Sequence, residues 1–180
     1  LEDLGLWFFS GFHVLHGISD RAIEGFNRLF SMDGDSRVRY YLKRGVRLAQ
    51  QGQHKKAASL LEWVVKSAPQ HRDALFQLGV CYLKLDFSRQ AISLLEQAKD
   101  LGEARPQLFS ILGMAYIRAG HDHKAVALLT PAAERYGDHF NIHYRLGLAW
   151  NNLGEFNRAM EAFQTALKIR PGEAKTYRSM

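Results

Sequence analysis

Apolar and small side chains recur along this chain at one fixed spacing of 34 residues. A short turn interrupts each period near its middle, which predicts two helices for each period. The most regular marker of the period is a glycine, which stands at Gly11, Gly45, Gly79, Gly113 and Gly147. A fixed period of this length is typical of a repeat architecture in which each helix pair packs on the next.

Two further positions explain how the helices of one period fit together. When the glycine is counted as position 8, position 20 is Ala57, Ala91, Ala125 and Ala159. Position 24 is large and apolar, at Leu61, Leu95, Leu129 and Phe163. Small residues allow two helices to approach closely, and the large ones fill the space beside them. The pattern resembles the tetratricopeptide repeat (TPR) over 38–173 and implies an all-α fold, a right-handed TPR solenoid of antiparallel helix pairs.

The period divides the chain into a degenerate N-terminal unit, four repeats and the start of a further helix. These segments are 1–37, then 38–71, 72–105, 106–139 and 140–173, and finally 174–180. Helix pairs are expected near 38–51 and 54–67, 72–85 and 88–100, 106–119 and 122–135, and 140–153 and 156–169. The loop 102–106 lacks the usual proline before the next repeat, and we expect a hinge there. Because the sequence starts with Leu1 and stops at Met180, where a new period has only begun, we also expect the natural chain to continue beyond both ends.

Residues 1–37 keep the period but fit the TPR pattern poorly. We expect two helices near 3–16 and 20–31, with many apolar side chains that include Trp7, Phe8 and Phe12. Two interpretations stay open: a self-assembly segment that seeks another surface, or a cap that packs on its own stack. The most apolar run, 4–15, is shorter than the roughly 20 residues that a bilayer requires, so no transmembrane helix is expected.

Charge is distributed unevenly along the chain. Residues 1–37 carry three basic and six acidic side chains, whereas 38–71 carry seven basic and one acidic. The basic patch in the first full repeat consists of Arg39, Lys43, Arg44, Arg47, Lys55, Lys56 and Lys66. It is interpreted as a solvated face, as a surface for an acidic partner such as another copy's N-terminus, or as a surface for anionic lipid. No nucleic acid is expected, because no aromatic residues are interleaved with these charges for stacking on bases.

In the TPR fold, the first helix of each pair lines a concave groove, through positions 5, 9 and 12 among others. Here these positions are mostly apolar. The predicted partner-binding groove consists of Leu42, Val46, Phe76, Val80, Leu83, Met114, Ile117, Tyr144 and Leu148. An apolar floor suits an amphipathic helix or an apolar peptide. We expect Phe76, Met114 and Tyr144 to be partly exposed; the alternative is that several of these residues only pack between repeats.

The groove lacks the residues with which chaperone-binding TPR proteins hold a terminal carboxylate. At the five corresponding positions this chain has Leu42, Val46, Gln77, Gln107 and Ile111 instead of lysine, asparagine and arginine. No nucleophile–base pair, phosphate loop or paired-carboxylate motif is present either. We therefore expect a binding protein, not an enzyme, with no cofactor.

Two further features carry weak chemical signals. His139 and His143 stand four residues apart, a spacing that can place two imidazoles on one ion, but structural zinc takes four ligands, so no metal site is expected. Asp122, between two other histidines, is expected to cap the next helix. Cys81 is the single cysteine and is interpreted as a small buried apolar residue; one cysteine allows no internal disulfide, which is compatible with the cytoplasm.

Beyond the repeat, the chain resembles the MamA family of magnetosome-associated TPR proteins. The resemblance lies in 30–37, which runs through Arg39-Tyr40-Tyr41 into Lys43-Arg44-Gly45, and in 145–156, which continues into 167–173. It implies a cytoplasmic scaffold in a magnetotactic bacterium, attached peripherally to the magnetosome membrane, whose partners are other magnetosome proteins and its own copies. The resemblance also implies a further repeat beyond residue 180, which we expect in the natural chain.

In that family the N-terminal helix is thought to occupy the groove of a neighbouring copy. The resemblance therefore implies that Trp7, Phe8 and Phe12 are the donor and the groove residues the acceptor. Head-to-tail contacts of this kind close rings or extend filaments. The alternative is a generic bacterial TPR adaptor, in secretion or envelope assembly, that binds a foreign peptide and does not self-assemble.

Overall fold

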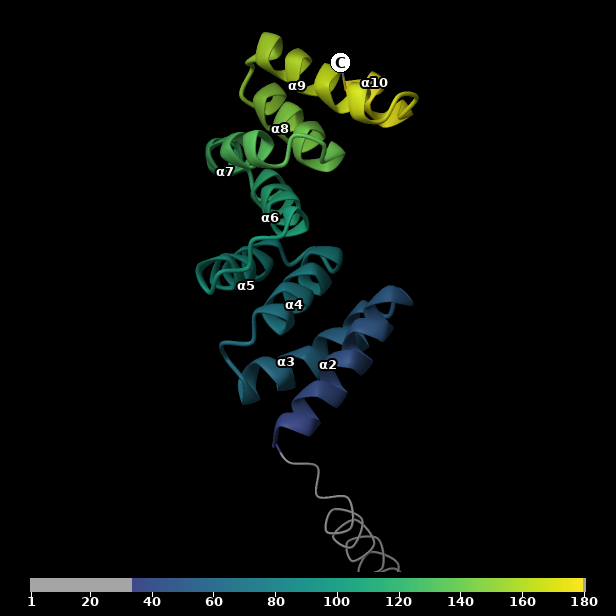
Figure 1. The fold of residues 1–180 in the computed structure, drawn as a ribbon, viewed down its shortest axis with the longest axis vertical. Coiled ribbons are helices and arrows are strands. Elements are labelled where there is room, and N and C mark those ends of the chain that lie inside the picture. Colours follow the sequence, from purple (N-terminus) through teal and green to yellow (C-terminus); the bar gives the residue numbers. More distant parts are fainter. Residues whose placement is uncertain (1–33, 180) are drawn as a thin grey trace, which may run out of the picture. The chain divides into compact units, whose positions relative to one another are not determined.

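The computed structural model describes residues 34–179, and these form helices joined by short turns (Figure 1). The first helices of the repeats are α2 (Gly34–Gln50), α4 (Arg72–Lys84), α6 (Pro106–Arg118) and α8 (Phe140–Asn152). The second helices are α3 (His54–Ser67), α5 (Ser88–Asp100), α7 (Asp122–Arg135) and α9 (Phe156–Ile169). A short helix, α10 (Ala174–Ser179), follows. The helices expected near 3–16 and 20–31 lie outside the described residues.

The chain falls into two units that meet inside α2, between Tyr40 and Tyr41. The described part of the first unit is the opening of α2, where Arg39 donates a hydrogen bond to the Ser36 hydroxyl at 3.0 Å. The second unit holds the rest of α2 and all the later helices. The observed bounds agree with the expected ones to within a residue, except that α2 begins at Gly34 and not near 38.

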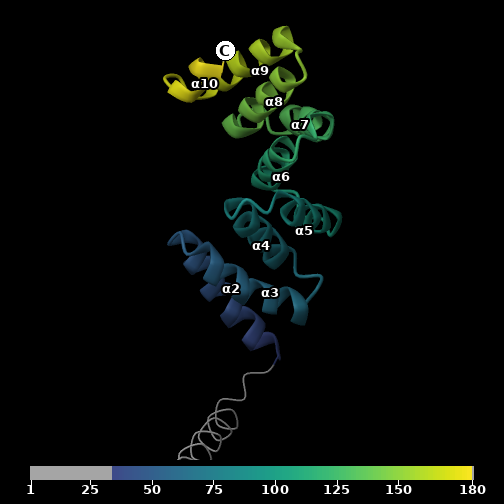
Figure 2. The ribbon, with the colours of Figure 1, turned by 180° about the vertical axis from the view of Figure 1, so that it is seen from behind.

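Within the second unit, each helix from α3 onward packs on the next one along the chain, and three of the first helices also pack in sequence. α4 contacts α6, and α6 contacts α8. The ribbon seen from front and back places α5 and α7 together on the side away from these first helices (Figures 1 and 2). This arrangement gives the TPR solenoid two different surfaces, one of first helices and one of second helices.

The period-34 glycines pack as the sequence predicts. A Cβ added to Gly79 would lie 2.7 Å from the Leu95 side chain, and a Cβ added to Gly147 would lie 2.6 Å from the Phe163 ring. Gly45 and Gly113 face Leu61 and Leu129 in the same way. The glycine at position 8 therefore lets the side chain at position 24 lie directly on the backbone of the partner helix.

The turn between the two helices of a repeat uses a left-handed residue. Gly52, Gly120 and Gly154 have φ values of 75°, 73° and 78°. The equivalent residue in the second repeat is Asp86, with φ 63°, and it is the only non-glycine residue with positive φ among those the structure describes. Its Oδ1 accepts a hydrogen bond from Arg118 at 3.1 Å, which offsets part of the strain of that conformation.

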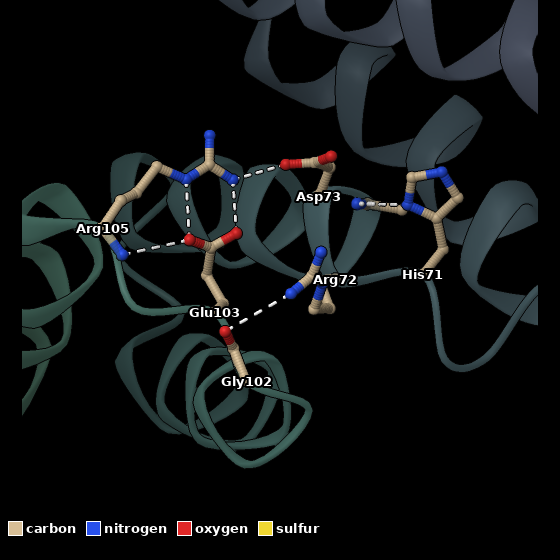
Figure 3. Close-up of polar contacts among 7 residues, drawn as sticks. His71, Arg72, Asp73, Gly102, Glu103 and Arg105 are labelled. Atoms are coloured by element: carbon tan, nitrogen blue, oxygen red, sulfur yellow. Dashed lines mark hydrogen bonds and ion pairs between the residues drawn. The ribbon is translucent and has the colours of Figure 1, made fainter.

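The loop 102–106, expected to be a hinge, is tied to its surroundings by several polar contacts (Figure 3). Arg105 binds Glu103 through Nε at 2.9 Å and through a terminal nitrogen at 2.7 Å, and it also pairs with Asp73 of the preceding first helix. Arg72 donates to the Gly102 carbonyl at 3.4 Å. These contacts restrain the loop and argue against a free hinge at this point.

Candidate partner-binding face

The first helices carry a row of partly exposed apolar side chains at equivalent positions. We call this row the first-helix face. Its members are Leu42, Val46, Val80, Met114, Ile117, Tyr144 and Leu148, all of them partly exposed. Because α6 contacts both α4 and α8, we treat the members on these three helices as one candidate surface. None of these positions carries a charged side chain, so the surface offers apolar atoms to a ligand.

Tyr144 is held in place while it stays accessible. Its ring stacks on Phe140 with centroids 5.8 Å apart and lies 5.8 Å from the Phe163 ring. Its hydroxyl lies 3.4 Å from the Ser179 hydroxyl of α10. Met114 packs against the main core from its partly exposed position. The expectation that Met114 and Tyr144 are partly exposed is thus confirmed.

The same expectation is wrong for Phe76, and Leu83 is also buried. Phe76 is 7% exposed and Leu83 is 5% exposed. The Arg105 guanidinium lies 4.7 Å from the centroid of the Phe76 ring, so a charged side chain from the following loop covers it. Both residues therefore stabilise the repeat and are not available to a ligand.

Tyrosine hydrogen bonds link the first helix of a repeat to the second helix of the preceding repeat. Tyr82 donates a hydrogen bond to Glu62 at 2.8 Å, and Tyr116 repeats the contact with Glu96. Burial and the Glu62 carboxylate raise the pKa of Tyr82 to about 12. Burial and the Glu96 carboxylate raise the pKa of Tyr116 further. Each tyrosine therefore stays protonated and serves as a donor throughout the physiological pH range.

Sequence reasoning placed Arg118 on the rim of the groove but missed Arg145, which lies near it. Arg145 on α8 donates a hydrogen bond to the buried Ser110 hydroxyl on α6. Arg118 at the end of α6 donates to the Leu83 carbonyl at 2.9 Å and to Asp86 at 3.1 Å. Burial and the charge of Arg118 lower the pKa of Arg145 to about 10. The sequence signal was an arginine at position 6, directly beside a groove position.

The basic patch is solvent-exposed at every member. In the second unit these members are Lys43, Arg44 and Arg47 on α2 and Lys55, Lys56 and Lys66 on α3. Arg39 belongs to the first unit and is also exposed. Within the described residues Lys43, Arg47, Lys55, Lys56 and Lys66 form no ion pair with an acidic side chain, so their charge is open to a ligand. Trp7, Phe8 and Phe12 lie outside those residues.

The surroundings of His139, His143 and Cys81 indicate structural roles. His143 Nε2 lies 3.0 Å from the Gly137 carbonyl, and His139 lies just before the first residue of α8 with a pKa lowered mainly by burial. No three metal-ligating side chains cluster anywhere in the described part of the chain. Cys81 is fully buried, as predicted, and burial raises the pKa of its thiol to about 11.

The expectation that Asp122 caps a helix is wrong. His121 is the residue before α7 and makes no side-chain capping bond, and Asp122 is the first residue of the helix itself. The Asp122 carboxylate instead accepts a hydrogen bond from the Asn152 side chain at 2.9 Å. It therefore links the third repeat to the fourth.

Among the described helices, none has the length and apolar composition needed to cross a membrane.

Comparison with known proteins places these features in a family. Residues 48–115 and 112–174 each match the tetratricopeptide repeat family. A structure of MamA AMB-1 is 33% identical, covering 81% of this chain and 79% of that one, with a TM-score of 0.69. A structure of MamA MSR-1 is 31% identical, covering 79% and 82%, with a TM-score of 0.70.

A more distant structure shares the fold alone. YrrB, described as a TPR protein with an unusual peptide-binding site, is 18% identical with a TM-score of 0.70 and covers 86% of this chain and 79% of its own. None of the curated protein sequences matches this chain significantly. One assignment follows from the helix pairs, the 34-residue period and the identity to the MamA structures over most of both chains. The chain belongs to the MamA family of tetratricopeptide repeat proteins.

Proposed function

We propose that this protein is a non-enzymatic scaffold that self-assembles, with the N-terminal segment of one copy bound along the first-helix face of another. The TPR fold and the MamA relationship support a role in protein–protein interaction. Through that relationship we further propose that the assembly coats magnetosome vesicles in the cytoplasm, peripherally bound to their membrane through other magnetosome proteins.

The observation that carries the proposal is the partly exposed apolar row on the first helices. Covering such apolar surface lowers the free energy by about 25 cal/mol for each Å² removed from water. Residues 1–31 supply a matching ligand, since they contain Trp7, Phe8 and Phe12 within one apolar run. An apolar helix laid on a row of apolar first-helix residues is a recurrent mode of recognition.

Charge supports the same pairing. Residues 1–31 contain four acidic and two basic side chains, whereas the second unit carries the exposed lysines and arginines of the basic patch. Opposite charges of this kind raise the rate at which two copies meet and favour one orientation over its reverse. The same patch would also attract an anionic lipid surface, which is compatible with peripheral membrane attachment.

Removing residues 1–31 is expected to convert the oligomer into a monomer. Sedimentation velocity at micromolar concentration measures this directly, with the intact 20.5 kDa chain as reference. A second variant of the 180-residue chain has Trp7, Phe8 and Phe12 all changed to serine, which keeps the segment but removes its apolar side chains. Both variants should sediment as monomers.

An unchanged oligomer in both variants would reject self-assembly through this segment. If the intact chain is itself monomeric and binds an unrelated amphipathic peptide on the first-helix face, the function is that of an adaptor for a foreign partner. The two results are distinguished by adding the peptide to the intact chain and repeating the sedimentation measurement.

A further inference from the structure

Arg145, next in sequence to Tyr144 of the first-helix face, is a largely buried cation that no acidic group of the described residues balances. Arg145 reaches from α8 to α6, where its terminal nitrogen donates to the Ser110 hydroxyl. Ser110 is neutral and only 2% exposed. No carboxylate in the described residues pairs with Arg145, although Arg105 and Arg118 have acidic partners. A guanidinium with five donors is thus satisfied at one of them by a protein side chain.

The neighbouring charges make this situation more unfavourable. Arg118 is close enough to Arg145 to lower its pKa, and its own charge is already balanced by Asp86. Burial of an unpaired charge costs free energy, and a charge-assisted bidentate bond to a carboxylate recovers it. The site therefore favours a ligand whose carboxylate accepts hydrogen bonds from the remaining donors of Arg145.

We propose that Arg145, together with Ser110, binds an aspartate or glutamate side chain of the segment that lies on the first-helix face. This inference rests on the proposed function, which makes that segment residues 1–31 of a second copy. That segment contains four carboxylates, at Glu2, Asp3, Asp20 and Glu24. The apolar row then supplies affinity, and Arg145 fixes the position of the bound segment along the stack.

The site differs from the terminal-carboxylate arrangement of chaperone-binding TPR proteins. The positions of that arrangement in the first three repeats are occupied by residues such as Leu42, Val46 and Ile111. Arg145 lies in the fourth repeat, and the Ser110 hydroxyl that accepts its hydrogen bond comes from the third. A side-chain carboxylate within a helix satisfies it, so no chain terminus is required at this point.

The test is a double-mutant cycle on self-association of the full chain, measured by sedimentation equilibrium. One variant is Arg145→Gln, and the other changes Glu2, Asp3, Asp20 and Glu24 to their amides. Arg145→Gln should weaken association by about tenfold or more, because it leaves a carboxylate in the interface without its partner. In the amide background the same change should have an effect of less than about twofold. Arg89→Gln, on an exposed residue of α5, is the matched control and should leave association unchanged.

A structural role alone predicts a different pattern. If Arg145 only supports the fold, Arg145→Gln lowers the melting temperature and weakens association equally in both backgrounds. Under our proposal the melting temperature of Arg145→Gln, measured at a concentration where the chain is monomeric, stays equal or rises, because an unbalanced charge has been removed. Equal effects of Arg145→Gln in both backgrounds would overturn the proposal. Loss of the oligomer on deletion of 1–31, combined with full association of Arg145→Gln, would overturn this inference and leave the proposed function intact.

Discussion

Replacing Phe163 with alanine is expected to lower the free energy of unfolding by about 3–5 kcal/mol. Phe163 is 1% exposed, and its ring lies against the backbone of Gly147, where a single added carbon would be 2.6 Å away. It also contacts the Tyr144 ring, with centroids 5.8 Å apart. Truncation leaves a cavity between α8 and α9 that a glycine on the facing helix has no side chain to fill. Urea unfolding followed by circular dichroism measures the loss.

The matched control for this variant is Phe156→Ala on the same helix. Phe156 is 68% exposed, so its truncation removes little buried area and should change stability by no more than about 0.5 kcal/mol. Equal losses for the two variants would contradict the packing described for position 24. A large loss for Phe156→Ala alone would show that the exposed end of α9 is covered in the folded protein.

Replacing Met114 with glutamate is expected to weaken self-association by about tenfold or more. Met114 is the member of the first-helix face that lies in the middle of α6, and it is partly exposed. A carboxylate at that point must be desolvated when an apolar segment covers it, and the bound segment carries a net negative charge of its own. Sedimentation equilibrium of the full chain measures the change in the association constant.

Met160→Glu is the control for that variant. Met160 is 43% exposed on α9, a second helix, so the same chemical change falls outside the first-helix face. It should leave association within about twofold of the unchanged chain. The melting temperatures of both variants must be compared, because Met114 also packs on the core. Loss of association in Met160→Glu but not in Met114→Glu would place the interface on the second helices.

The fold followed from the sequence because its determinants are local and repeated. Glycine at position 8 and a large side chain at position 24 recur in every full repeat, and the structure places Gly79 against Leu95 as that spacing requires. The helix ends follow from the turn residues in the same way. Asp86 departs from glycine at this turn, yet it adopts the same left-handed conformation because the architecture on both sides demands it.

The details of the candidate face depended on contacts between distant residues, which a single sequence does not reveal. Phe76 occupies a groove position by its spacing, but Arg105 covers its ring from the next loop. Arg145 and Ser110 are 35 residues apart and meet only because α6 and α8 pack together. The same kind of contact ties the loop 102–106 to Asp73, where composition alone indicated a hinge.

The most direct test of the account is a photo-crosslink from position 12 of the N-terminal segment. The full chain would carry a photoreactive phenylalanine analogue in place of Phe12, and equal amounts of unlabelled and ¹⁵N-labelled chains would be mixed before irradiation. Mass spectrometry then identifies both the attachment sites and whether the two halves come from different copies. We predict mixed-isotope products attached to α4, α6 and α8, near Val80, Met114 or Leu148. Products confined to single copies, or attached mainly to the second helices α5, α7 and α9, would contradict it.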